Sequence, residues 1–466
     1  MNQMMPPPEL PARSINPATG ELIEEHGFAS DAAVEQVLAA AAAAQKTWAR
    51  TPLDERSVFL KRCAGLLRER RDSLAETITR EMGKPLVEAL GEVEKSAFNC
   101  EYVADHGAEW LADRDAPSNA TQSYVSFLPL GVVFGVMPWN FPVWQIFRFT
   151  VSALMSGNAV ILKHAPNVQG CAKLVERLIR DAGAPAGLFA NLTASLRSVP
   201  AIVNDSRIAA VTLTGSRRAG SALAALAGAA CKKSVLELGG LDPFIVLADA
   251  DLDGAVAAAA RGRFGNCGQV CIAPKRFILE ESIADAFTER FVAAGEKLVI
   301  GDPMDRATTL GPMARGDLRD ELHDIVEKTV AAGARVLTGG APIEGPGNFF
   351  QPTVLDGVTS DMAAATRETF GPVASLMRVA SADEAVAMAN DSEFGLSSNL
   401  WTRDLDHGRA LARRIEAGGV FINGVSASDP RLPVGGIKQS GYGRELAAFG
   451  MHEFTNIQTV WIGPVA

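Results

Sequence analysis

Short apolar runs rich in β-branched residues are the feature that most constrains how this chain folds. From residue 125 the sequence contains the runs "GVVFGVMP", "NAVILKHAP", "IAAVTLTGS" and "KSVLELGG". Each run reaches a Gly or Pro, and at least two precede a helical stretch. This alternation predicts buried parallel strands that alternate with helices. A second series follows, with "DPFIVLADADLDGAVAAAARG" and "ARVLTGG" among its parts. The expected fold class is therefore α/β.

The first hundred residues predict helices. The segment "SDAAVEQVLAAAAAAQKTW" begins with a capping residue, Ser30 or Asp31, and continues through strong helix formers. The segment "LDERSVFLKRCAGLLRERRDSLAETITREMGKP" carries apolar residues at helical spacing and ends at Gly83 and Pro85.

Length and charge exclude some classes of protein. A chain of 466 residues corresponds to about three domain-sized units, or to two larger units with an insertion. Its residues are 47% hydrophobic and 21% charged, which is ordinary for a globular protein with a sizeable core. The 44 basic and 54 acidic residues leave a net charge of −10, which argues against a general nucleic-acid binder with a basic face.

No segment predicts an export signal or a membrane span. The N-terminal "MNQMMPPPELPARS" lacks an apolar core and a cleavage site. The longest apolar stretch, "GVVFGVMPWNFPVWQIF", is interrupted by two prolines and is shorter than a membrane span requires. Six cysteines in a chain of this length do not make a disulfide framework. We therefore expect a cytoplasmic chain whose thiols are mostly reduced.

Two cysteines four residues apart, Cys267 and Cys271, lie in "FGNCGQVCIAPKRF". No second cysteine pair or histidine cluster completes a zinc site, so no metal is expected. A disulfide between them requires a bent loop and does not suit a reducing compartment. A nucleophile remains. Without a neighbouring histidine, its activation has to come from backbone N–H groups or from a lowered thiol pKa.

Two polar residues interrupt apolar segments. Glu237 lies in "VLELGG" just before two glycines, and a buried carboxylate there has to be paired, hydrated or functional with a raised pKa. The alternative is a carboxylate that caps a loop. Asn140 lies between aromatic residues and Pro142 in "MPWNFPVWQIFR". Either it bonds its own turn in an aromatic corner, or it holds an amide donor for an oxyanion.

Two strand ends are candidates for binding a nucleotide. "TLTGSRRAG" places Gly215 and Gly220 at a strand-to-helix turn, where backbone N–H groups can approach a phosphate. The spacing differs from the usual dinucleotide fingerprint and from a P-loop, so an ordinary tight turn is the alternative. Lys163 ends the run "ILK". It is either a solvated strand end or a nucleotide contact, since parallel sheets bind ligands at the carboxyl ends of their strands.

Seven motifs follow one another along the chain: "PWNFP", "LKHAP", "TGSRRAG", "LELGG", "GQVC", "ETFGPV" and "GGIKQSGYGRE". In this order they resemble the aldehyde dehydrogenase superfamily. The likeness extends from "INPATGELI" near the start to the last dozen residues. "GRELAAFGMHEFTNIQTVW" and "LKHAPN" are similar to the short bacterial succinate-semialdehyde dehydrogenases in particular.

The resemblance implies three catalytic residues. Cys271 attacks the aldehyde to give a thiohemiacetal, which becomes a thioester when hydride leaves for the nicotinamide ring. The Asn140 amide and the Cys271 backbone N–H form the oxyanion hole, and a donor of that kind is worth about 3–4 kcal/mol. Glu237 is the base for the attacking water and a candidate base for the thiol. Relatives that pass the acyl group to coenzyme A typically lack this glutamate, so a hydrolytic enzyme is expected. Cys267 is not catalytic by this correspondence; it either forms a reversible disulfide with Cys271 or packs the loop.

The resemblance also implies a nicotinamide cofactor. The expected cofactor-binding residues are Trp139, Lys163 (adenosine ribose), Gly215 and Ser216 (pyrophosphate), Gly220, and Glu368 and Phe370 (nicotinamide side). Many NAD-preferring relatives carry a glutamate at the position of Pro166, where it binds the ribose hydroxyls and repels a 2′-phosphate. Because proline does neither, either NAD or NADP is expected, with NAD slightly favoured.

The expected substrate is succinate semialdehyde, oxidised to succinate. Arg148, eight residues after Asn140, matches an arginine that binds the far carboxylate of the substrate in human-type relatives, and arginine suits a bidentate grip on a carboxylate. Its alternative is a structural salt bridge. A second arginine of those relatives is Gly265 here, and Arg431 in "SASDPRLPVGG" is a candidate replacement on a loop expected near the tunnel mouth. The alternative functions are oxidation of other aldehydes (glutarate semialdehyde or aliphatic ones) and a non-catalytic binding or structural protein on the same fold.

The resemblance predicts three parts of the fold. Residues 1–115 and 131–240 form a Rossmann-like NAD(P)-binding domain, and residues 241–445 form an α/β catalytic domain. Residues 116–130 and 446–466 form a small β extension for oligomerisation, and "TQSYVSFLPL" predicts one of its strands. We expect a homodimer or homotetramer that acts on a small-molecule aldehyde, with no nucleic-acid or membrane partner.

Overall fold

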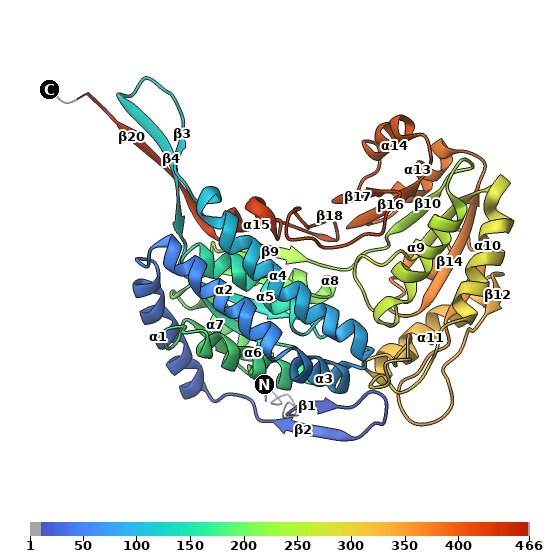
Figure 1. Ribbon diagram of the computed structural model, residues 1–466, viewed down its shortest axis with the longest axis horizontal. Helices are drawn as coiled ribbons and strands as arrows, with labels where there is room; N and C mark the ends of the chain where they lie inside the picture. Colours follow the sequence, from blue (N-terminus) through green and yellow to red (C-terminus); the bar gives the residue numbers. More distant parts are fainter. Residues whose placement is uncertain (1–10, 465–466) are drawn as a thin grey trace, which may run out of the picture.

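The computed structural model describes residues 11–464 as two lobes side by side, with a narrow β ribbon projecting from the first lobe (Figure 1). Residues 1–10 and 465–466 lie outside the described residues. Most of the N-terminal segment "MNQMMPPPELPARS" and the outermost ends of two predicted domain ranges therefore lie outside the described residues.

The first lobe contains a six-stranded sheet. From one edge to the other its strands are β19 (Gly441–Tyr442), β9 (Lys233–Glu237), β8 (Ile208–Thr214), β5 (Val132–Met137), β6 (Ala159–His164) and β7 (Phe189–Asn191). All neighbouring strands are parallel except β19, which is antiparallel to β9. β6 is buried at every position, as expected of a central strand covered on both faces. The four apolar runs after residue 125 are thus confirmed as parallel strands.

Helices cover both faces of this sheet, and a small hairpin, β1 (Ala12–Ile15) and β2 (Leu22–His26), packs beside them. The helices are α1 (Asp31–Trp48), α2 (Leu53–Glu69), α3 (Arg71–Met82), α4 (Leu86–Trp110), α5 (Trp144–Met155), the 3-10 turn η1 (Pro166–Val168), α6 (Gln169–Asp181), α7 (Val199–Asn204), α8 (Arg217–Ala229) and α15 (Ala447–Glu453).

The predicted N-terminal helices are present, with one difference. The Ser30 hydroxyl caps α1 by accepting the Ala33 N–H at 3.3 Å. The helical stretch predicted up to Gly83 consists of two helices, α2 and α3, separated at Arg70. Gly83 ends α3 with a φ of 83°, a left-handed conformation that glycine adopts without strain.

The second lobe contains a seven-stranded sheet. Its strands, in order, are β12 (Arg335–Thr338), β13 (Thr353–Asp356), β14 (Val373–Val379), β11 (Arg276–Glu280), β10 (Pro243–Val246), β16 (Ser397–Trp401) and β17 (Gly419–Ile422). Its helices are α9 (Leu252–Phe264), the 3-10 turn η2 (Gly265–Gly268), α10 (Glu281–Glu296), α11 (Gly316–Ala331), α12 (Ala363–Thr366), α13 (Ala382–Asn390) and α14 (Leu405–Ala412). The run "ARVLTGG" forms β12, which is an antiparallel edge strand and not a buried parallel one.

Two short strands, β15 (Phe394–Gly395) and β18 (Ile437–Lys438), pair beside the second lobe, and the projecting ribbon is a third antiparallel unit. In the ribbon, β4 (Gln122–Pro129) pairs with β20 (Thr455–Ile462) along its whole length, and β3 (Arg114–Asp115) adds a short edge. The strand predicted from "TQSYVSFLPL" is therefore confirmed as β4.

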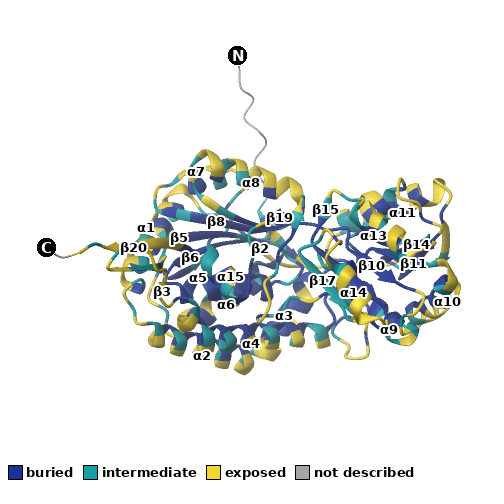
Figure 2. Cartoon of the chain, turned by 90° about the horizontal axis from the view of Figure 1, so that it is seen from above, coloured by how far each residue is buried: buried dark blue, intermediate teal, exposed yellow. Residues whose placement is uncertain are grey.

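The chain returns to the first lobe near its end. β19 lies inside the range 241–445 that the sequence assigns to the catalytic domain, yet it pairs with β9 of the first sheet. The predicted domain ranges remain predictions. Each lobe has its own buried core around its sheet, with exposed helix faces outside (Figure 2).

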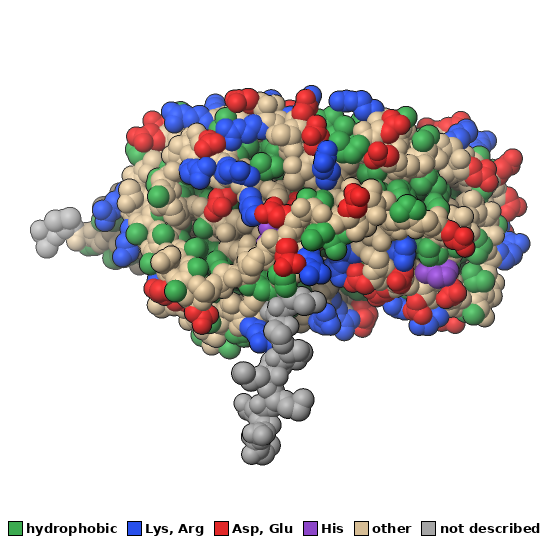
Figure 3. Space-filling model, turned by 90° about the horizontal axis from the view of Figure 1, so that it is seen from below, with side chains coloured by type: hydrophobic (Ala, Val, Ile, Leu, Met, Phe, Trp, Pro, Cys, Tyr) green, Lys and Arg blue, Asp and Glu red, His purple; other side chains and the backbone are tan. Residues whose placement is uncertain are grey.

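The surface mixes both signs of charge. On the face seen in Figure 3, acidic and basic side chains are interspersed. Among residues 11–464, no helix combines the length and the apolar character needed to cross a membrane.

Candidate active site

The carboxyl ends of three neighbouring strands bring distant parts of the sequence together. β5, β8 and β9 are adjacent and parallel, so they end at the same edge of the sheet. Asn140 follows β5, and Gly215 follows β8. Glu237 is the last residue of β9, and its carbonyl accepts the Gly215 N–H at 2.9 Å. Open parallel sheets bind ligands at this edge.

Cys271 comes from the second lobe, on a loop between α9 and β11. Just before it, Asn266 and Cys267 have φ values of 52° and 54°, in the left-handed region that such residues rarely adopt. Arg263, buried at the end of α9, donates to the Gly268 carbonyl at 2.5 Å. Strained backbone of this kind persists only where its surroundings impose it. The loop is therefore built to hold its residues in one conformation.

Asn140 is attached to the same loop by two hydrogen bonds. Its Nδ2 donates to the Gln269 carbonyl at 3.0 Å, and the Asn266 Nδ2 donates to the Asn140 carbonyl at 2.9 Å. A side-chain amide nitrogen carries two hydrogens. One of them positions Asn140 against the loop, and the other can serve the predicted oxyanion hole.

Burial raises the pKa of the Cys271 thiol to about 11. The positive charges of Arg148 and Lys275 oppose this rise in pKa, whereas the carboxyl groups of Glu237 and Asp242 add to it. At neutral pH the thiol is therefore protonated. Since the thiolate is the nucleophile, a base has to accept this proton before Cys271 can attack.

Glu237 has the properties expected of that base. Its side chain is buried, and burial raises its pKa to about 8, with the charge of Arg148 opposing the rise. Within the described part of the chain, its Oε1 makes no hydrogen bond. A carboxyl group whose pKa lies near the operating pH can both accept and return a proton. The structure thus brings Cys271, Asn140 and Glu237 together, and their catalytic roles remain our prediction.

A cavity of about 440 Å³ is lined by Asn140 and Cys271, and by Leu238, the residue after Glu237. Seven residues predicted to bind cofactor or to act in catalysis line it: Trp139, Asn140, Gly215, Ser216, Cys271, Glu368 and Phe370. The rings of Trp139 and Phe370 meet edge to face with centroids 5.8 Å apart. The Glu368 carboxylate accepts the Gly240 N–H at 3.1 Å and lies 3.4 Å from the Lys275 Nζ.

The residues of this cavity fit a dinucleotide. Ser216 caps α8, so the backbone N–H groups and positive dipole at the start of this helix face the cavity that Ser216 lines. A Cβ on Gly215 would have Leu213 as its nearest protein neighbour, at 3.6 Å. Glycine is therefore not required there by protein packing, and it keeps the backbone accessible from the cavity.

Two predicted cofactor residues do not line this cavity. Gly220 lies within α8, where a Cβ would come within 2.5 Å of the Leu238 side chain. The lack of a side chain at Gly220 therefore lets α8 pack closely against Leu238. Lys163 is buried in β6, two strands from β8 in the sheet order. Its contact with the cofactor remains a prediction.

Arg148 lies in a buried ion pair. Its Nε pairs with a carboxylate oxygen of Glu445, and its Nη2 donates to the Thr214 hydroxyl at 2.9 Å. The structural salt bridge that the sequence left as an alternative is therefore present. The same guanidinium acts electrostatically on Glu237 and Cys271, which places it beside the reacting groups. Its predicted grip on a substrate carboxylate remains a prediction.

Arg431 lies at the surface. Its side chain is 61% exposed and makes two hydrogen bonds with Asp429, at 2.8 and 2.6 Å. It is not among the residues that line the cavity beside Cys271 or a second cavity, of about 270 Å³, that includes Ile272. The structure does not bring it together with the other candidates.

Two charged residues of the site were missed in the sequence. Lys275 is fully buried and its Nζ donates to the Cys271 carbonyl, while Glu445 neutralises Arg148. Both lie within motifs that drew attention, "CIAPKRF" and "GYGRE". Their positions in these motifs were the signal that could have identified Lys275 and Glu445 from the sequence. Only the fold shows that Lys275 contacts the Cys271 carbonyl and that Glu445 pairs with Arg148.

Cys267 packs in the core of the second lobe and is 2% exposed. Burial raises the pKa of its thiol far above the ordinary value. Both Cys267 and Cys271 are free thiols here. These observations favour the packing role for Cys267.

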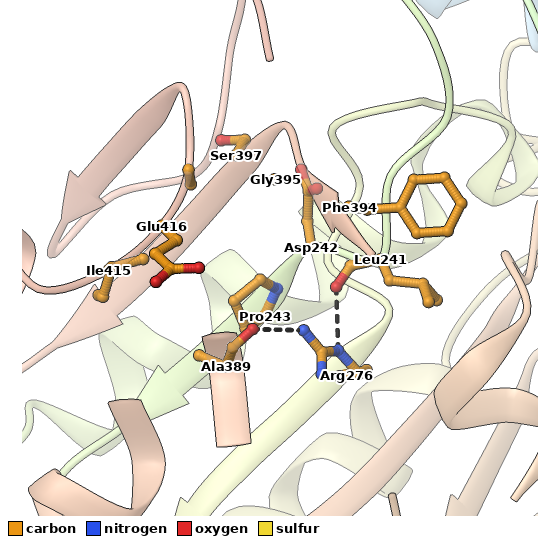
Figure 4. A pocket seen from close by; sticks show the side chains of 11 residues that line it. Leu241, Asp242, Pro243, Arg276, Ala389, Phe394, Gly395, Ser397, Ile415 and Glu416 are labelled. Atoms are coloured by element: carbon orange, nitrogen blue, oxygen red, sulfur yellow. Dashed lines mark hydrogen bonds between the residues drawn. The ribbon is translucent and has the colours of Figure 1, made fainter. Parts of the chain in front are cut away.

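A smaller cavity of about 10 Å³ lies near the second sheet (Figure 4). The Arg276 guanidinium donates to the carbonyls of Leu241 at 3.0 Å and Ala389 at 2.8 Å. Arg276 thus ties the segment before β10 to the end of α13, which is a structural task. Across residues 11–464, no group of His, Cys, Asp and Glu side chains is arranged to hold a metal ion.

Comparison with known proteins places the chain among relatives. Residues 7–460 match the family model described as "Aldehyde dehydrogenase family". The chain is 53% identical over 454 residues to the Escherichia coli (strain K12) protein named succinate semialdehyde dehydrogenase NAD(P)+ Sad, covering 97% of this chain and 98% of that relative. It is 48% identical over 458 residues to the Mycobacterium ulcerans (strain Agy99) succinate-semialdehyde dehydrogenase NADP(+) 1, covering 97% and 100%.

Solved structures agree with these relatives. The succinic semialdehyde dehydrogenase of Streptococcus pyogenes, solved with NADP+ as the cofactor, superposes with a TM-score of 0.95 at 38% identity, covering 97% of this chain and 100% of that one. The enzyme from Burkholderia pseudomallei, a succinate-semialdehyde dehydrogenase, gives a TM-score of 0.94 at 35% identity, covering 97% and 94%. The fold expected from the sequence motifs is thereby confirmed.

The raised pKa of the Cys271 thiol predicts its reactivity. Alkylation of Cys271 by iodoacetamide should accelerate steadily from pH 7 to pH 10, because the thiolate fraction grows about tenfold per unit below the pKa. Mass spectrometry of the peptide that contains Cys271 measures the rate, and Cys271→Ser provides the blank. A rate that already levels off below pH 8 would contradict a thiol that is protonated at neutral pH.

The Arg148–Glu445 pair predicts a loss of stability on truncation. Arg148→Ala leaves the Glu445 carboxylate buried without its partner, so the free energy of unfolding should fall by about 3–5 kcal/mol. Chemical denaturation measures it, with Arg180→Ala on the exposed face of α6 as the matched control. Equal stabilities of the two variants would show that the pair contributes little.

Proposed function

The chain belongs to the aldehyde dehydrogenase family, and from that premise we propose that it oxidises succinate semialdehyde to succinate with NADP+ or NAD+. As a member of this family it is an NAD(P)-dependent oxidoreductase. The observation that carries the proposal is the convergence of Cys271, Asn140 and Glu237 beside the 440 Å³ cavity. The substrate is supported by relatives of 48% and 53% identity that carry this activity in their names.

The first chemical step forms a bond between the protein and the substrate. Glu237 accepts the thiol proton of Cys271, and the thiolate adds to the aldehyde carbon to give a thiohemiacetal. The Asn140 Nδ2 and the Cys271 backbone N–H hold the developing oxyanion. The pKa values of about 8 and about 11 make this proton transfer unfavourable by itself, so we propose that bond formation drives it.

The second step releases the product. When bound, NAD(P)+ supplies the hydride acceptor that turns the thiohemiacetal into a thioester. Glu237 releases the proton it took from Cys271 to solvent and then deprotonates a water molecule, which attacks the thioester carbon. The Cys271 thiolate leaves and takes back a proton from Glu237, which restores both groups. The balance is one aldehyde, one water and one NAD(P)+ consumed, with one carboxylic acid, one NAD(P)H and one proton formed.

Both cofactors suit the chain. Pro166 follows β6 and provides no carboxylate to repel a 2′-phosphate. The slight preference for NAD expected from the sequence is not supported by the relatives, whose names give NADP(+) or NAD(P)+. We therefore propose that NADP+ is accepted at least as well as NAD+.

A second candidate is the oxidation of uncharged aliphatic aldehydes. The observation that favours it is the Arg148–Glu445 pair, which already neutralises the arginine expected to bind a substrate carboxylate. The two candidates differ in whether the site discriminates for a negative charge at the far end of the substrate.

Assembly and location complete the proposal. We propose a homodimer or homotetramer formed through the β4–β20 ribbon, which exposes Ile457 and Trp461 by 58% and 53%. A monomer in light scattering would contradict it. We also propose a cytoplasmic location, where the six free thiols would stay reduced. Reporter fusions and cell fractionation test it.

Substrate specificity is the direct test. The kcat/KM for succinate semialdehyde should exceed that for butanal by about a hundredfold, or about 2.7 kcal/mol, if the site binds the carboxylate. Initial rates with succinate semialdehyde, glutarate semialdehyde and butanal, each with NADP+ and NAD+, measure it. Equal values for butanal would favour the second candidate.

The raised pKa of Glu237 predicts the pH dependence of turnover. A base works in its deprotonated form, so kcat should rise with pH through about 8. Glu237→Gln should lose about 100-fold or more of kcat together with this rise. The matched control is Glu296→Gln at the exposed end of α10. A flat profile between pH 6.5 and 9.5 in the unmodified protein would exclude Glu237 as the rate-limiting base.

A further inference from the structure

One lysine close to the reacting groups has no part in the chemistry described so far. Lys95 lies on α4, and its Nζ donates to the Ser428 hydroxyl at 2.6 Å. The same Nζ lies 4.3 Å from the centroid of the Trp144 ring, on α5. Three segments that are distant in sequence thus meet at this ammonium group.

Lys95 has no carboxylate of its own. Among the residues that the structure describes, none forms a salt bridge with it: Glu92 pairs with Lys84, and Asp429 pairs with Arg431. The charges that act on Lys95 are those of Arg148, Lys84, Glu92, Cys271 and Asp429. Arg148 and Lys84 are cations, and Glu92, Cys271 and Asp429 are acidic groups, but none of these acidic groups forms a salt bridge with Lys95.

Burial, together with the positive charge of Arg148, lowers the pKa of Lys95 to about 8. The side chain is nevertheless only partly buried, so part of it remains accessible. A partly accessible ammonium group in a poorly hydrated place, without a counter-ion, is suited to receive an anion from outside the protein.

The contacts of Lys95 link it to the helix that carries Arg148. Trp144 and Arg148 are one helical turn apart on α5, so they lie on the same face. Asn99, one turn after Lys95 on α4, donates to the Phe147 carbonyl at 3.1 Å and keeps the two helices in contact. Once ionised, the Cys271 thiolate interacts electrostatically with Lys95.

A second cavity is lined by sequence neighbours of Cys271 and Ser428, although Lys95 itself does not line it. It has a volume of about 270 Å³ and is lined by Ile272, next to Cys271, and by Ala427, next to Ser428. Its other lining residues are largely apolar, among them Leu396, Phe421, Leu432 and Val434. Two consecutive residues thus line different cavities: Cys271 lines the cavity of about 440 Å³, and Ile272 lines this apolar cavity.

We propose that Lys95, held by Ser428 and Trp144, binds the far carboxylate of the aldehyde substrate while Cys271 attacks its carbonyl carbon. This inference rests on the proposed function and names a specificity-determining residue for it. A substrate carboxylate supplies the counter-ion that Lys95 lacks. Lys95 also offers a cation where Gly265 provides none and where Arg148 is already paired with Glu445.

The test uses paired substrates and three variants. Lys95→Met keeps the length of the side chain without its charge, Lys95→Arg keeps the charge, and Lys61→Met removes an exposed lysine on α2 as the matched control. The ratio of kcat/KM for succinate semialdehyde to that for butanal should fall about 10- to 100-fold in Lys95→Met. Most of this fall should come from KM. Lys95→Arg should recover part of the ratio, and Lys61→Met should match the unmodified protein.

A second readout does not depend on turnover. Iodoacetate and iodoacetamide have nearly the same size but differ in charge, and both alkylate thiols. The ratio of their rates at Cys271 should fall in Lys95→Met, because the anionic reagent loses its attraction. If Lys95→Met does not fold, Ser428→Ala replaces it, and both ratios should fall by a smaller factor as the ammonium group loses its hold.

The pH dependence gives a third readout. The positive form of Lys95 is lost as pH rises through about 8, so KM for succinate semialdehyde should rise above that pH while KM for butanal does not. In Lys95→Arg this rise should move to higher pH, since arginine stays protonated. A role confined to packing against Trp144 would not produce this shift.

The outcomes separate the two proposals. If the unmodified protein handles butanal as well as succinate semialdehyde, the proposed function fails. If the unmodified protein prefers succinate semialdehyde but Lys95→Met keeps the same substrate ratio and the same alkylation ratio, only the role of Lys95 fails. A fall in both ratios, with partial recovery in Lys95→Arg, supports it.

Discussion

The buried ion pair between Arg148 and Glu445 is the interaction on which the rest of the site depends. It joins α5 of the first lobe to the segment that follows the second lobe, and its guanidinium also reaches Thr214 at the end of β8. Glu237 is buried and Cys271 is half-buried, and the charge of Arg148 lowers the pKa of each. Without this cation, two acidic groups would lie in a poorly hydrated place with little compensation.

Desolvation raises the pKa of both reacting groups, with different consequences for their chemistry. A carboxyl group with a pKa of about 8 is poised to exchange protons near neutral pH, while a thiol with a pKa of about 11 is kept in its unreactive form. A protonated thiol is protected from unwanted alkylation and oxidation. The same lack of water makes an ammonium group such as Lys95 a selective partner for an anionic substrate, because an isolated cation gains most from a counter-ion where water is scarce.

Much of the fold could be predicted from the sequence, because local patterns control it. The apolar runs became β5, β6, β8 and β9, and Ser30 capped α1 as its side chain predicts. The break at Arg70 was not predicted, since helical periodicity continues across it. The reversed direction of β12 was also missed, because a strand's direction depends on which neighbour it meets and not on its own residues.

By itself, the sequence determined which residues can do the chemistry: a cysteine on a glycine-bearing loop, a glutamate at a strand end and an asparagine among aromatic residues. It also predicted that buried parallel strands end near Gly215 and Glu237. That β5, β8 and β9 are neighbours, so that Asn140, Gly215 and Glu237 meet at one edge, is decided by the tertiary structure. Only the tertiary structure decided the state of each group. The pairing of Arg148 with Glu445, nearly 300 residues apart, and the exposure of Arg431 arise from the packing of distant segments, as does the lone charge of Lys95. Charge interactions depend on distance and burial, which the order of residues along a chain does not contain.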